Sequence, residues 1–143
     1  MKVFDGKQWG EMTPMISNRC RHGSVVFQGQ LWAVGGYNGR FLSSVEQYSF
    51  ASGQWTPMTA TMNVRRGRVG VVTSGSKGKN SLQLYSKFIV YAIGGYDGMH
   101  NLTTIETYDP EEGHWVMAGK MARHEGGVGV AALPINCSNW LSE

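Results

Sequence analysis

The sequence predicts an all-β protein built of short strands, and three of its features carry that prediction. The 143 residues include 20 glycines and only four prolines, together with five tryptophans and six tyrosines. Short aromatic runs separated by glycine turns are typical of β-structure. Hydrophobic residues make up 41% of the chain and charged residues 16%, a balance that indicates a folded unit and not a disordered tail. The third feature is an internal repeat.

The repeat consists of a double glycine with a tyrosine, then a β-branched residue with a glutamate, then a tyrosine and a tryptophan. The first copy contains Gly35, Gly36, Tyr37, Val45, Glu46, Tyr48 and Trp55, and the second contains Gly94, Gly95, Tyr96, Ile105, Glu106, Tyr108 and Trp115. Ahead of each double glycine, a second pattern recurs at steps of four residues: Met15, Arg19, Gly23 and Met62, Arg66, Gly70, with Met121, Glu125, Gly129 beginning a third copy.

Each copy is predicted to form four strands, which in the first copy span residues 23–28, 31–34, 45–50 and 54–58. The double glycine ends the second strand, where it lets neighbouring backbone approach closely and permits positive φ. Tyr48 and Trp55 lie on the outer strands and supply the apolar area by which one unit packs on the next, and Tyr108 and Trp115 do so in the second copy.

The repeat boundaries divide the chain into five segments. These are 1–18, a linker with the outer strand of a preceding unit at residues 4–9; 19–65, a full unit; 66–126, a full unit with an insertion; 127–134, the innermost strand of a next unit; and 135–143, a tail. The insertion is placed at about residues 78–89, because Arg66 to Gly94 spans 28 residues where Arg19 to Gly35 spans 16. A genuine loop and a retained intron both remain open explanations of it.

The order of these motifs resembles the kelch repeat, and the 46 residues from Trp9 to Trp55 are close to that repeat's period of about 50. The runs at residues 19–23 and 124–130 are similar to the C-terminal blades of the kelch-like adaptors, which carry BTB and BACK domains ahead of a propeller. The resemblance implies a partial kelch β-propeller, with about two four-stranded antiparallel blades flanked by strands of incomplete blades. Because propellers close with about four to eight blades, we expect an open arc.

In the adaptor family, the BTB and BACK domains bind Cullin-3, while the propeller recruits the protein to be ubiquitinated. Neither domain is present in these 143 residues, so the resemblance implies only the substrate-recognition part of a ubiquitin ligase complex. Two alternatives stay open. The chain is a kelch protein that binds actin or another cytoskeletal filament, or it is a truncated gene model with no independent activity.

The strand order predicts the binding face, because antiparallel first and second strands bring the start of one and the end of the other to the same edge. The residues expected to bind a partner are Arg19, Arg21, Tyr37, Asn38, Arg66, Arg68, Tyr96 and Asp97. In kelch-like adaptors, the matching arginine and tyrosine positions line a peptide pocket. An acidic or phosphorylated peptide is the expected ligand, since arginine offers a fork of donors to carboxylates. The alternative is that these arginines only satisfy loop carbonyls.

Catalytic, metal and cofactor sites are not expected. The four histidines, His22, His100, His114 and His124, occupy unrelated positions of the repeat, and no GxSxG, P-loop or HExxH motif occurs. Cys20 and Cys137 lie far apart, which favours a reducing compartment, and no apolar run approaches the roughly 20 residues of a membrane span. The charge of +3 is scattered, so neither nucleic acid nor membrane is an expected partner. We expect the protein in the cytoplasm, with the nucleus as the alternative.

Overall fold

The computed structural model describes residues 1–76, 87–123 and 127–133, and its main feature is a pair of four-stranded antiparallel sheets. The first sheet holds β3 (Gly23–Phe27), β4 (Gln30–Val34), β5 (Val45–Ser49) and β6 (Gln54–Pro57) in chain order. The second holds β7 (Gly70–Ser76), β8 (Lys87–Ile93), β9 (Thr104–Asp109) and β10 (His114–Lys120). In the described ranges there is no helix, and hence none that could span a membrane. The all-β class and the four-stranded blades are confirmed.

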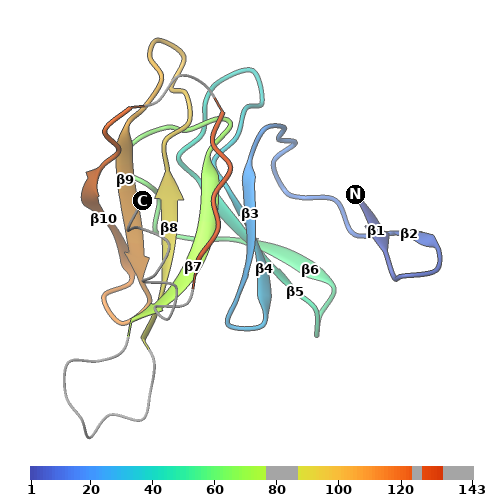
Figure 1. The fold of residues 1–143 in the computed structure, drawn as a ribbon. Coiled ribbons are helices and arrows are strands. Elements are labelled where there is room, and N and C mark those ends of the chain that lie inside the picture. The colour runs from blue at the N-terminus through green and yellow to red at the C-terminus, as the bar shows by residue number, and fades with distance from the viewer. Residues whose placement is uncertain (77–86, 124–126, 134–143) are drawn as a thin grey trace, which may run out of the picture.

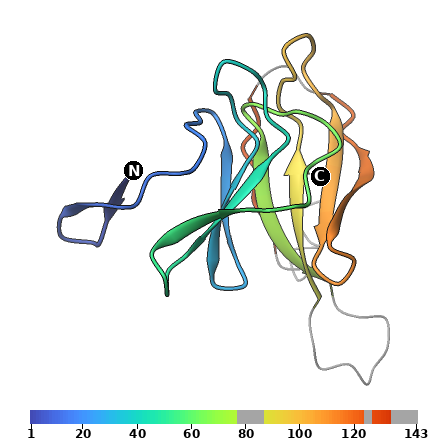
Figure 2. The same ribbon diagram turned by 180° about the vertical axis from the view of Figure 1, so that it is seen from behind.

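The two sheets lie side by side as neighbouring blades (Figure 1), and the view from behind shows the same arrangement (Figure 2). One hydrophobic core fills the seam between them. The Trp32 ring meets Phe27 of its own sheet at 5.2 Å and Tyr108 of the other at 5.3 Å, both edge to face. The buried core residues are Phe27, Trp32, Val34, Val45, Met62, Val69, Val90, Ala92 and Trp115. Because both blades contribute to one core, neither buries its apolar face alone.

The innermost strands approach closely where the repeat has glycine. A Cβ atom added to Gly23 on β3 would lie 2.8 Å from the carbonyl oxygen of Val69, just ahead of β7. Gly70 on β7 meets the next segment in the same way, since its Cβ would lie 2.7 Å from Val130 and 2.9 Å from Val128. Residues 127–133 therefore lie against β7 as β7 lies against β3, although they form no regular strand.

The N-terminal segment differs from the prediction. Residues 4–9 are not one outer strand: they form the turn between β1 (Lys2–Phe4) and β2 (Trp9–Glu11), which pair as a hairpin. The Asp5 carboxylate closes the turn by accepting the backbone N–H groups of Lys7 and Gln8, both at 2.8 Å. Phe4 and Trp9 face each other at 5.3 Å, much as Tyr48 meets Trp55 and Tyr108 meets Trp115. The hairpin thus repeats the third and fourth strands of a blade with a shorter turn.

The predicted insertion at residues 78–89 also needs correction at its end. Residues 87–89 belong to β8, which continues the antiparallel ladder with β7 as far as the pair Ser76 and Lys87. Strands β7 and β8 are each seven residues long, where β3 and β4 are five. The rest of the insertion, and the predicted tail at 135–143, lie outside the described residues.

Candidate partner-binding face

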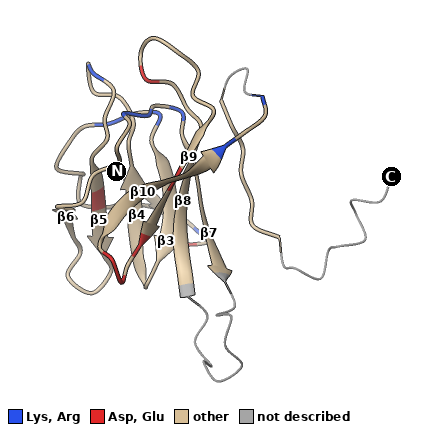
Figure 3. Ribbon diagram, turned by 90° about the vertical axis from the view of Figure 1, so that its left-hand side faces the viewer, with Lys and Arg blue, Asp and Glu red and all other residues tan. Residues whose placement is uncertain are grey.

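The segments that carry the predicted residues meet at one edge of the sheets, as the strand order predicts. The backbones of Cys20 and Tyr37 exchange hydrogen bonds of 3.0 and 2.8 Å, which ties the entry of β3 to the loop after β4. Gly67 and Tyr96 do the same in the second blade, with both bonds at 2.8 Å. This edge is the upper one in Figure 1, and in Figure 3 the blue of Lys and Arg gathers on its loops.

Arg19 and Arg66 are buried below this edge, whereas the prediction requires them to be exposed on it. Arg66 has no exposed surface; its Nη1 donates to the carbonyls of Gly94 and Thr104, both at 2.8 Å. Its Nη2 and Nε donate to Glu106 Oε1 at 3.0 and 3.1 Å. Arg19 is likewise buried and bonded to the matching carbonyls of the first blade. Their guanidinium groups are bonded inside the fold, so neither residue offers a free fork of donors to a partner.

The two buried glutamates are the partners of these arginines. Glu46 accepts from Arg19 Nη2 at 2.5 Å and from the backbone N–H groups of Ile16 and Ser17 at 2.8 and 2.9 Å. Burial by itself would raise the pKa of Glu46, but the bonds from Ser17 and Arg19 outweigh it and hold the pKa below its ordinary value. Each glutamate therefore joins a blade's third strand to the linker that enters the blade.

Glu106 has the same arrangement with more donors. It accepts the backbone N–H groups of Asn63 and Val64 at 2.6 and 3.1 Å, and the Asn63 side chain at 2.9 Å. Burial lowers the pKa of Arg66 below its ordinary value, while the bond to Glu106 opposes that change. Sequence reasoning recorded both glutamates as repeat residues without giving them a role. The available signal was that an arginine and a glutamate recur together in each copy.

Arg21 and Arg68 are exposed arginines of the edge, one on each blade, and Arg40 and Arg65 are exposed in the neighbouring loops. Both are held at positive φ, 56° for Arg21 and 53° for Arg68, a conformation that is uncommon for residues other than glycine. The N–H of Arg68 donates to the carbonyl of Arg21 at 2.6 Å, so the two backbones are in direct contact across the seam. This contact places two cationic residues of neighbouring blades next to each other.

An aromatic row lies beside them. Phe41, from the loop after β4, is packed between Tyr37 at 5.0 Å and Tyr96 at 5.3 Å, and meets Tyr96 edge to face. Phe41 is half-buried, and sequence reasoning did not select it. The available signal was a phenylalanine in a loop of mainly glycine and polar residues. The row joins the two predicted tyrosines into one surface across the seam.

Asn38 and Asp97 take matching places in the two loops, but only Asn38 is fully exposed. The Asp97 carboxylate accepts the N–H groups of Met99 and His100 at 2.7 and 2.8 Å. These bonds, that from His100 first, hold the pKa of Asp97 below its ordinary value. Asp97 is therefore an anion that closes its own loop, and it makes the second blade's end of the edge less favourable for an acidic ligand.

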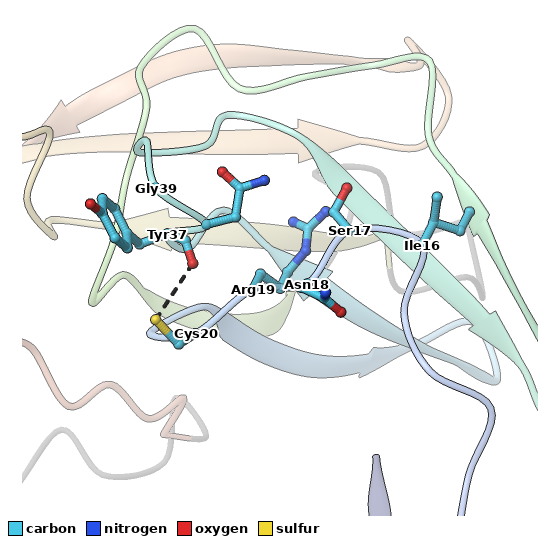
Figure 4. Close-up of a pocket in the computed structure, with 8 residues that line it drawn as sticks. Ile16, Ser17, Asn18, Arg19, Cys20, Tyr37 and Gly39 are labelled. Carbon is cyan, nitrogen blue, oxygen red and sulfur yellow. Dashed lines mark hydrogen bonds between the residues drawn. The ribbon is translucent and has the colours of Figure 1, made fainter.

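An open pocket of about 840 Å³ lies at the first blade's end of the edge (Figure 4). Its lining residues are Ile16, Ser17, Asn18, Arg19, Cys20, Tyr37, Asn38 and Gly39. The Cys20 thiol is exposed and lies 3.5 Å from the Tyr37 carbonyl oxygen. Within the described ranges, no three His, Cys, Asp or Glu side chains come close enough together to hold a metal ion.

Comparison with known proteins identifies the repeat. The sequence matches the Kelch motif over residues 18–61 and 89–122. It is 31% identical to alpha-scruin of Limulus polyphemus over 94% of this chain, and 34% identical to mouse Kelch-like protein 35 over 75%. It is also 30% identical to rat Kelch-like protein 7 over 84%. The chain spans only 14%, 17% and 19% of these relatives, respectively.

A solved structure has the same fold. The structure of YjhT superimposes with a TM-score of 0.62 over 82% of this chain and 44% of the other, at 15% sequence identity. At that identity the likeness concerns the fold alone, and it supports the assignment of the two sheets as propeller blades.

Proposed function

We propose that this chain, which belongs to the kelch-repeat family, binds a protein partner at the loop edge that carries Arg21, Arg68, Tyr37 and Tyr96. The observation that carries the proposal is the backbone contact between Arg21 and Arg68, which makes two exposed arginines of neighbouring blades adjacent beside an aromatic row. Arginine and tyrosine are the residues most enriched among those that dominate binding energies. Arg19 and Arg66 take no part, because they are buried.

The charge distribution favours an acidic or phosphorylated segment as the ligand. Two arginine forks can each hold a carboxylate or a phosphate through paired hydrogen bonds. Asp97, at the other end of the edge, disfavours an anion there. The partner's acidic residue is therefore expected over Arg21 and Arg68, with neutral or aromatic residues toward Tyr96.

The matches to kelch-like proteins support the proposal of a role in substrate recognition for a Cullin-3 ubiquitin ligase. We propose the cytoplasm as its location, with the nucleus as the alternative. In such an assembly the BTB and BACK domains of a longer protein would bind Cullin-3, and this edge would select the protein to be modified. No catalytic step is assigned to the chain itself. Co-sedimentation with actin filaments tests the cytoskeletal alternative.

The decisive experiment measures binding of an acidic phosphopeptide library to the 143-residue chain and to its Arg21→Ala and Arg68→Ala variants. Each variant is expected to weaken binding of the selected peptides about tenfold or more, as for the loss of a dominant contact. The Tm should stay within about 2 °C of the parent, because substitutions of exposed side chains cost within about 0.5 kcal/mol.

Lys7→Ala is the matched control, since it removes an exposed cation on the β1–β2 turn, away from the edge. If Lys7→Ala weakens peptide binding as much as Arg68→Ala does, the peptide is held by nonspecific electrostatic attraction and the loop edge is not its binding site.

A further inference from the structure

Exposed arginines gather on the loop edge at the seam between the two blades, and we call them the seam cluster. They come from the entry of β3, the loop after β4 and the linker into β7, and they are Arg21, Arg40, Arg65 and Arg68. Figure 3 shows how Lys and Arg gather on these loops. Because both blades that form this seam are described, the loops of the cluster have their neighbours on each side.

Backbone hydrogen bonds fix these three segments to one another. The N–H of Arg68 donates to the carbonyl of Arg21 at 2.6 Å, which joins the linker to the entry of β3. The N–H of Arg66 donates to the carbonyl of Leu42 at 2.9 Å, which joins the linker to the loop after β4. The remaining two arginines of the seam cluster lie one and two residues from this second bond. All four side chains therefore start from backbone that is held together as one unit.

The arginines of the seam cluster have no acidic partner within the described ranges. None of the four forms an ion pair or donates a side-chain hydrogen bond there, in contrast to Arg19 and Arg66. The Asp97 carboxylate accepts the N–H groups of its own loop, and Glu46 and Glu106 are buried with their own arginines. Since clustered like charges repel one another, the stability of the fold does not account for the cluster.

Two arginines of the seam cluster are held in a strained backbone conformation. Arg21 and Arg68 have φ values of 56° and 53°, a region that glycine occupies freely and that other residues occupy at a cost. The third copy of the repeat has Gly127 at this position, so the repeat does not require an arginine there. Strained residues cluster at sites that hold ligands. Strain, exposure and unpaired charge together point to an anion as the partner of the cluster.

We propose that the seam cluster binds a phosphorylated side chain of the protein partner, so that phosphorylation of the partner controls its recognition. This inference rests on the proposed function and narrows its ligand from any acidic residue to a phosphate. A phosphoserine carries a charge of about −1.5 to −2 and three acceptor oxygens, whereas a carboxylate carries a single charge and two oxygens. One arginine fork satisfies a carboxylate, and arginines from three segments supply the donors and the charge that a phosphate needs.

The test compares three synthetic peptide libraries that differ at one fixed position, which is phosphoserine, glutamate or serine. The 143-residue chain is used to select from each library, and the selected sequences are made in all three forms for calorimetric measurement of Kd. We expect the phosphoserine form to bind about tenfold or more tightly than the glutamate form, with the serine form weakest. Equal or tighter binding of the glutamate form would overturn this inference and leave the proposed function standing. If no library is bound, both fail.

Variants of the arginines that the proposed function does not use give an independent measurement. Arg40→Ala and Arg65→Ala should each weaken binding of the phosphoserine form about fivefold or more, and binding of the glutamate form less than about twofold. Lys7→Ala, the control, should change neither. Equal losses for the two forms would overturn the inference, because the extra arginines would then not distinguish a phosphate from a carboxylate.

Arg68→Gly separates a binding role from a structural one. Glycine accepts the positive φ at this position, so the variant should lose the preference for phosphoserine at a Tm equal to or above that of the parent. A lost preference accompanied by a lower Tm would make Arg68 a structural residue and overturn the proposal.

Nucleic acid is another phosphate-rich ligand, and the distribution of charge argues against it. The net charge is only +3, and the seam cluster is confined to one seam, whereas nucleic-acid sites carry their cations along an extended face. Oligothymidylate should therefore bind more weakly than the phosphoserine peptide. Tighter binding of the oligonucleotide, with the same dependence on Arg40 and Arg65, would overturn the proposal.

Discussion

Replacing Glu106 with glutamine tests whether the buried arginine and glutamate pairs are structural. Glu106 accepts five hydrogen bonds, two from Arg66, two from Asn63 and one from Val64, and neither member of the ion pair has exposed side-chain surface. The glutamine keeps the shape but leaves the Arg66 charge buried without a counter-ion. Breaking a buried pair from one side costs about 3–5 kcal/mol, so we expect a loss of about 3 kcal/mol of unfolding free energy.

The assay is urea unfolding followed by tryptophan fluorescence, because Trp32 and Trp115 are buried in the seam between the blades. The free energy of unfolding of a single domain is about 5–15 kcal/mol. A loss of this size should therefore lower the urea concentration at the unfolding midpoint by a large amount. The double variant Arg66→Met, Glu106→Leu should be more stable than Glu106→Gln, since it leaves no unpaired charge. A loss below about 0.5 kcal/mol in Glu106→Gln would refute the reasoning.

Two further predictions concern packing and pH. Gly23→Ala should lower the free energy of unfolding by about 1–3 kcal/mol in a thermal melt, because its Cβ would lie 2.8 Å from the Val69 carbonyl oxygen. Gly119→Ala is the control and should be neutral, since its Cβ would have nothing within 4 Å. Equal effects of the two substitutions would refute the close approach at Gly23. Burial, and then the charge of Arg19, lower the pKa of His22 below its ordinary value of about 6.5. The unfolded chain then binds more protons below that pH, so stability should fall as the pH drops below about 6.5. His22→Gln should remove this slope in chemical denaturation, and an unchanged slope would assign it to another group.

The blade architecture follows from the sequence because its determinants are local. Strands expected at residues 31–34 and 54–58 are observed at Gln30–Val34 and Gln54–Pro57, since hydrophobic alternation and glycine turns fix them. The two errors in strand boundaries arise where pairing with a partner strand, and not the local sequence, determines where a strand begins or ends. The turn from Phe4 to Trp9 is shorter than in the other copies, so the sequence pattern does not separate the two strands of the hairpin. The ladder between β7 and β8 extends to Lys87, and only its partner strand determines where it stops.

The position of the loop edge was predictable, but the role of each of its residues was not. Antiparallel pairing brings Tyr37 and Tyr96 to one edge whatever the side chains are. The roles of the arginines depend instead on glutamates that lie 27 and 40 residues further along the chain. No local pattern shows that Glu46 points inward toward Arg19. The alternative prediction, in which the arginines satisfy loop carbonyls, describes the contacts of Arg19 and Arg66 better than a binding role does. It does not include their bonds to Glu46 and Glu106.

Each blade entry has a pair of arginines separated by a single residue, the first of which is buried and the second exposed. Arg66 is buried and forms an ion pair with Glu106, whereas Arg68, which has a positive φ, is exposed. Because Arg66 also holds the carbonyls of Gly94 and Thr104, its loss releases the loop that positions Tyr96. An Arg66→Ala variant should therefore lose both stability and partner binding. Reduced binding in that variant does not identify a contact, whereas reduced binding in Arg68→Ala at unchanged Tm does.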